Sequence, residues 1–167
     1  HYLCGEKIFD CRIFDTATLI SPTMIITTDF LKECLEILDL KYTELDDGRI
    51  AVSFYDEDTF PYQIVTFIRI YDDTMISFSS QAFDYHPEGD LLMMANRHNC
   101  RCHTPACYID SDGDVIMDRT YIIDADVSPH YLLENVIRPS IYLPLDGFIY
   151  FELSNEELEA LREKDNE

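Results

Sequence analysis

The chain has 167 residues, of which 47% are hydrophobic and 13% aromatic, so it is long and apolar enough for one domain with a buried core. Its 33 acidic and 12 basic residues give a formal net charge of −21. This charge disfavours binding to nucleic acids and to anionic membranes, because both depend on lysine and arginine. It favours solubility or attraction toward basic partners instead.

The six cysteines are interpreted as reduced thiols of a cytoplasmic protein. No secretory signal precedes them in this sequence, and no apolar run reaches the roughly 18 residues of a membrane span. The sequence begins with His1, which leaves removal of an earlier signal segment open. We therefore expect a cytoplasmic location and no membrane contact.

The first predicted helix runs from Thr28 to Leu40, because apolar residues recur there at helical spacing and Thr28 is suited to cap it. Residues 1–27 indicate an added strand or an extended lead-in. Apolar and alternating stretches then predict strands joined by short turns, in an antiparallel arrangement. These strands are Ile50–Tyr55, after a turn at Asp47-Gly48, then Ile64–Ile70, which is apolar on both faces, and Met75–Phe83.

The second half of the chain predicts a helix, a hairpin and another helix. The helix spans Pro87–His98, with Leu91, Leu92, Met94 and Ala95 facing inward. The hairpin joins Ala106–Ile109 to Val115–Ile123 through a turn at Asp112-Gly113. The last helix starts after Ser128 with Pro129 at its first position, and we expect Pro139 and Pro144 to kink or interrupt it.

These elements define an α+β protein with helices packed on one face of an antiparallel sheet. We divide the chain into an N-terminal extension (1–27), one α+β domain (28–153) and a short acidic C-terminal helix or tail (154–167). The tail begins with a capping-box pattern at Ser154–Glu157.

The order of the elements resembles the YbjN family, described as bacterial sensory-transduction regulators, over roughly Thr28 to Leu153. The stretches that carry this resemblance are DDGRIAVSF, LLMMANRHN with Asn96 and Asn99, and the DSDGDV hairpin. The resemblance implies a fold like that of type III secretion chaperones, which are small, acidic and often dimeric. It implies no enzymatic activity. The N-terminal 27 residues and the cysteine cluster depart from the family pattern.

The cysteine cluster is the sharpest candidate for metal chemistry. Its residues are soft or borderline ligands that suit Zn²⁺, namely His98, Cys100, Cys102, His103 and Cys107. The Cys-x-Cys spacing and the lack of a second cluster argue against a zinc site, and buried cysteines acting as small hydrophobic residues explain the pattern as well. We therefore expect no metal and no cofactor.

Other motifs also favour structural roles. A calcium loop starting at Asp110 would need glycine and glutamate where Val115 and Tyr121 stand, so a hairpin turn is the better interpretation. Asn96 and Asn99 are expected to satisfy carbonyl groups at the helix end and in the following turn. The sequence contains no recognisable nucleophile, phosphate-loop or metalloprotease motif, so we do not expect an enzyme.

The leading hypothesis is a non-enzymatic protein-binding module that acts as a chaperone-like or regulatory adaptor. The alternative is a thiol- or metal-dependent protein that uses Cys100, Cys102 and Cys107. For the first hypothesis we expect a protein partner, self-association into a homodimer and no nucleic acid. The apolar strand Ile64–Ile70 and the proline-containing segment with Ile141, Leu143 and Leu145 form the apolar patch expected at the dimer interface. Alternatively, residues 1–27 cover this patch and the protein is a monomer. The candidate partner-binding residues are Ile64, Phe67, Ile141, Leu143 and Leu145.

Overall fold

The computed structural model describes residues 26–72, 74–102, 104–123 and 127–153, together with residues 157, 160, 163 and 164. The predictions for residues 1–25 and for the capping box at Ser154 lie outside the described residues. In chain order the elements are α1 (Thr28–Ile37), β1 (Tyr42–Glu44), β2 (Ile50–Asp56), β3 (Phe60–Tyr71), β4 (Met75–Ala82), α2 (Leu91–Arg101), β5 (Ala106–Ile109), β6 (Val115–Ile122), α3 (Pro129–Tyr131), the π-helical segment η2 (Leu132–Ile137) and α4 (Arg138–Glu152).

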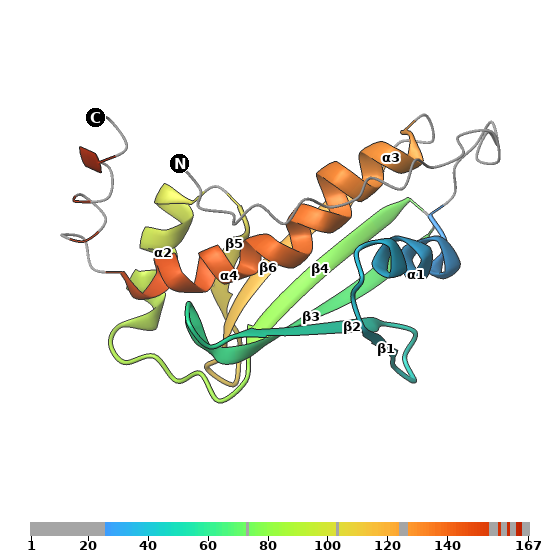
Figure 1. Ribbon diagram of the computed structural model, residues 1–167. Helices are drawn as coiled ribbons and strands as arrows, with labels where there is room; N and C mark the ends of the chain where they lie inside the picture. Colours follow the sequence, from blue (N-terminus) through green and yellow to red (C-terminus); the bar gives the residue numbers. More distant parts are fainter. Residues whose placement is uncertain are drawn as a thin grey trace.

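The strands form one six-stranded sheet in the order β1-β2-β3-β4-β6-β5, and every neighbouring pair is antiparallel. The helices lie against one face of this sheet (Figure 1). The α+β class predicted from the sequence is therefore confirmed. β1 was not predicted, because three residues are too few to show an alternating pattern.

Two hydrophobic clusters join the helices to the sheet. The first packs α1 and η2 on β2, β3 and β4, and includes Leu35, Val52 and Ile141, all without exposed surface. The second packs α2 and the end of α4 on the other half of the sheet, and includes Phe148 and Phe151, which are also fully buried. No described helix is long and apolar enough to cross a membrane.

α1 begins at Thr28 as predicted but ends at Ile37 rather than Leu40, and its capping residue and the start of α2 differ from the prediction. Thr27, not Thr28, caps α1 by accepting a hydrogen bond from the Phe30 N–H at 3.1 Å. α2 begins at Leu91 rather than at Pro87, because the Asp90 side chain caps it by accepting from the Met93 N–H.

The side chains of α2 that face inward also differ in part from the prediction. Ala95 is buried and Leu91 and Met94 pack partly against the second cluster, as predicted. Leu92, predicted to face inward, is instead 72% exposed.

The predicted hairpin is confirmed. Ile109 pairs with Val115, and the Asp110 carboxylate accepts hydrogen bonds from the N–H groups of Asp112 and Asp114. Gly113 has φ +89, in the left-handed region where glycine is favoured. The Asp110–Asp114 stretch is thus held by its own turn contacts.

The last helix is not broken by its prolines. Ser128 caps it and Pro129 occupies its first turn, as predicted, and the helical path continues through η2 and α4 to Glu152. Pro139 falls in the first turn of α4, directly after the π segment, where Arg138 donates its N–H to the Leu133 carbonyl. The predicted interruption is therefore wrong; the helix only changes its hydrogen-bond pattern just before Pro139.

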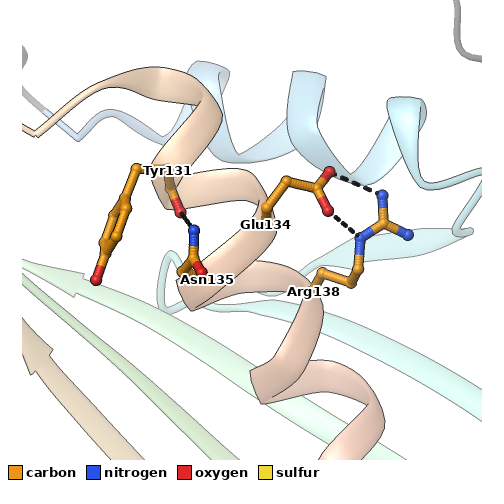
Figure 2. A network of polar contacts seen from close by, with 4 residues as sticks. All are labelled: Tyr131, Glu134, Asn135 and Arg138. Atoms are coloured by element: carbon orange, nitrogen blue, oxygen red, sulfur yellow. Dashed lines mark hydrogen bonds and ion pairs between the residues drawn. The ribbon is translucent and has the colours of Figure 1, made fainter.

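Side chains reinforce this irregular segment on its outer surface. The Asn135 amide donates to the Tyr131 carbonyl at 3.3 Å, and the Arg138 guanidinium forms two hydrogen bonds to the Glu134 carboxylate at 2.9 and 3.0 Å (Figure 2). The two partners of each pair are four residues apart, so they lie on neighbouring turns of the helix. Pro144 is buried in α4, where packing of the surrounding apolar side chains offsets the lost backbone hydrogen bond.

Candidate functional site

The cysteine cluster is distributed over different environments. Cys107 is buried in the second cluster, Cys102 is half-buried at the end of α2, and Cys100 is exposed; His103 lies outside the described residues. Among the described residues, no group of three or more His, Cys, Asp or Glu side chains is arranged to hold a metal ion. Burial raises the pKa of the Cys107 thiol to about 12, which keeps it protonated and unreactive.

His98 is committed to a structural contact. It is buried, and its Nε2 lies 3.0 Å from the Pro105 carbonyl oxygen. Because a carbonyl oxygen only accepts, Nε2 must carry the proton. Burial lowers the pKa of His98, so the neutral ring is favoured.

Asn99 binds the free edge of the sheet. Its amide donates to the Cys107 carbonyl and its oxygen accepts from the Cys107 N–H, both at 2.7 Å. β5 is the last of the described strands in the sheet, so within the described residues one side of its backbone has no strand neighbour. Asn99 therefore takes the place of a further strand at that edge. Its predicted role as a partner of the helix end is wrong, because the groups it binds lie eight residues further along the chain.

Arg97 completes this set of contacts. Its guanidinium donates to the Phe151 carbonyl at 3.0 Å and so binds one of the last carbonyl groups of α4. The stretch Arg97-His98-Asn99 thus links α2 to α4, to Pro105 and to β5. In the LLMMANRHN stretch, these three residues therefore have structural contacts that attach α2 to the rest of the fold.

The partner-binding candidates divide by burial. Ile64 and Ile141 are 1% and 0% exposed and pack in the core of this same chain, so their side chains are not presented at the surface. Leu143 and Leu145 on α4 are half-buried. Phe67 is half-buried and points to the face of the sheet opposite the helices, because it alternates with the buried Thr66 and Ile68.

That opposite face, here called the open face, is the candidate functional site. None of the described helices covers it (Figure 1). Its side chains alternate with the buried positions of β2 to β6 and form rows across the strands. They comprise Ala51, Ser53, Tyr55, Pro61, Gln63, Val65, Phe67, Arg69, Tyr71, Met75, Ser77, Ser79, Gln81, Ala106, Tyr108, Ile116, Asp118, Thr120 and Ile122.

Large apolar side chains are accessible on the open face, among them Tyr55 of β2, which is 56% exposed. Ile122 is 85% exposed and Tyr108 is 46% exposed. In the row of Tyr108, Ile116 on β6 and Val65 on β3 are nearly buried although they belong to neither core cluster. The sequence had indicated that Ile64–Ile70 is apolar on both faces, and the structure shows β3 flanked by β2 and β4, with its second apolar face toward the open side.

The open face carries little charge. Arg69 and Asp118 are its charged residues, and Arg49 reaches over one corner with its guanidinium 5.0 Å from the centre of the Phe67 ring. Asp47 forms an ion pair with Arg49 at 2.7 Å at that corner. Burial raises the pKa of the Asp118 carboxyl. In a chain of net charge −21, this face is close to neutral.

Comparison with known proteins gives a family but no curated relative. No curated protein matches the chain. The family model of YbjN, described as "Putative bacterial sensory transduction regulator", matches residues 27–136. This match includes α1, the whole sheet and α2, and ends within η2. The chain therefore belongs to the YbjN family.

Proposed function

We propose that this protein is a non-enzymatic regulatory module that binds another protein through the open face of its sheet. The observation that carries the proposal is a nearly uncharged surface with accessible Tyr108 and Ile122 on an otherwise strongly acidic chain. Membership in a family described as sensory transduction regulators supports a regulatory role. A chaperone-like mode of action, in which the face receives a segment of a client protein, belongs to the same proposal.

The chemistry of the cysteines supports a non-enzymatic role. Burial raises the pKa of Cys34 to about 12 and also raises the pKa of Cys102, so both thiols are disfavoured as nucleophiles. The four described cysteines are free, which fits action in the reducing cytoplasm.

Site-specific crosslinking tests the proposal. A photoreactive amino acid is introduced at Tyr108 or at Ile122 on the open face, and at Leu92 on α2 as the control, because Leu92 is also exposed. The variants are irradiated in cells that express the chain naturally. We expect discrete crosslinked protein species from the two open-face positions and none of the same size from Leu92. Identical crosslinks from all three positions, or none from the open face, would contradict the proposal.

A further inference from the structure

We infer that the partner of the open face is a second copy of this chain, packed face to face about a two-fold axis that runs along β4. This inference rests on the proposed function, because it names the protein that the proposed binding surface receives. It assigns a specific role to Arg69 and Asp118, which neither the sequence patterns nor the family match had singled out.

The charge distribution argues for a partner as acidic as the chain itself. A surface that evolved to receive a basic partner would carry acids, since complementary potentials steer association. The chain has 33 acidic residues, yet among the open-face residues of β2 to β6 the one acidic residue is Asp118. Keeping acids off one face removes close repulsion between two copies of net charge −21. The remaining charges lie further apart, and salt screens them beyond about 8 Å at 0.15 M ionic strength.

The side chains of β4 permit close approach along the proposed axis. On the open face the middle of β4 presents the small Ser77 and Ser79, while the longer Met75 and Gln81 lie toward its two ends. A two-fold axis along β4 places β3 of each copy over β6 of the other, because these two strands flank β4. The small serines can then face their own counterparts.

The same axis brings opposite charges together. Ser79 is in register with Phe67 on one side and Asp118 on the other, and Ser77 is in register with Arg69. With β3 of one copy over β6 of the other, Arg69 of one copy lies one side-chain row along the strands from Asp118 of the other, which is within its reach. The two-fold symmetry repeats this pair. Each copy thus contributes one cation and one anion, as a self-complementary interface requires.

The open face is large enough for a stable contact. Five strands at about 4.8 Å spacing and β3 residues 63–71 at about 3.3 Å per residue give a flat area of roughly 500–600 Å². Side-chain relief increases the accessible area toward the roughly 800 Å² that each partner buries in a standard interface.

The test uses the purified full chain alone. Sedimentation equilibrium at 0.15 M salt measures the dissociation constant for the wild type, Arg69→Asp, Asp118→Arg and the double variant that exchanges the two charges. Glu33→Arg on α1 is the control for charge, because it changes the net charge as much as Asp118→Arg but lies exposed on the helix side. We expect a dimer of about twice 19.5 kDa for the wild type.

Like charges then face each other in either single variant, which should raise the dissociation constant by on the order of 100-fold. The double variant should recover most of this loss, and Glu33→Arg should dimerise at least as well as the wild type.

The outcomes separate this inference from the proposed function. A monomeric wild type overturns the second copy as partner, and open-face crosslinks to a different protein would at the same time uphold the proposed function. A monomer that dimerises once residues 1–25 are removed would assign the open face to that segment of the same chain, which also overturns the inference. A dimer that none of the charge changes affects would place the interface elsewhere.

Discussion

Replacing Asn99 with alanine tests the attachment of α2 to the edge of the sheet. The substitution removes two hydrogen bonds of 2.7 Å to the Cys107 backbone. Each such bond contributes about 0.5–1.5 kcal/mol, and Asn99 lies at the surface, where water can partly replace the lost partner. We therefore expect a loss of about 1–2 kcal/mol, lessened by roughly 0.5 kcal/mol because alanine favours the helix.

Asn96→Ala provides a matched control. Asn96 is exposed on the same helix, so this variant gains the same helix propensity without the contact to Cys107. The chain has no tryptophan, and circular dichroism can follow unfolding in urea. The difference between the two variants should appear as a urea midpoint lower by about 0.5–1 M for Asn99→Ala.

Hydrogen exchange supplies a local measurement. In the wild type the Cys107 N–H is bound to Asn99, so its exchange should be slow for an edge strand. Asn99→Ala should accelerate exchange at Cys107 while leaving the amides of β3 unchanged. Equal midpoints for the two variants, together with unchanged exchange at Cys107, would refute the assignment of Asn99 as the group that occupies the edge.

Three further predictions concern stability. Gly113→Val should lower the free energy of unfolding by about 1–2 kcal/mol, because Gly113 has φ +89; a Cβ there meets no atom within 4 Å, so Gly113→Asn, which tolerates this conformation better, should recover much of the loss in thermal unfolding. Gly147→Ala should destabilise α4 by about 1 kcal/mol, because the new Cβ would lie 3.1 Å from Met117 Sδ and 3.2 Å from Pro105 Cγ, and such overpacking costs more than the helix propensity of alanine returns; an unchanged melting temperature would contradict it. Burial depresses the pKa of His98 in the folded state, so the contribution of this residue to stability is present above the unfolded-state pKa of about 6.5 and is lost as the pH falls toward the folded-state pKa. The free energy of unfolding, measured from pH 7.5 to 5, should therefore decline less for His98→Gln than for the wild type, and parallel declines would speak against this reasoning.

Long, strongly patterned segments were predictable from the sequence. The alternation in β4 correctly put Ile76 and Phe78 on one face and Ser77 and Ser79 on the other, because a strand has a strict period of two. The Asp-Gly turn of the hairpin was equally readable, because its glycine is needed for a positive φ.

Helix boundaries were less predictable because neighbouring residues offered equivalent signals. Thr27 and Thr28 are both suitable caps, and only the fold selects the first. Pro87 suits a first helical turn, but Gly89 at φ +115 and the capping Asp90 delay α2 until Leu91. Leu92 is exposed because it lies about 100° around the helix from the inward side that Leu91, Ala95 and His98 define.

Contacts between distant segments could not be predicted at all. Asn99 pairs with Cys107, and Arg97 with Phe151, which lies 54 residues away. The near-neutral character of the open face also emerges only after folding, because its residues are dispersed over five strands between acidic loops.

The π-helical segment has a consequence for insertions and deletions. The buried pairs Leu132/Leu133, Val136/Ile137 and Ser140/Ile141 recur every four residues, whereas two turns of an α-helix hold about 7.2 residues. A π turn accommodates the extra residue, since each N–H bonds a carbonyl five residues back. Relatives one residue shorter here would form an ordinary α-helix with the same side toward the sheet. An added or lost residue further along α4 would instead rotate Phe148 and Phe151 by about 100° out of the core.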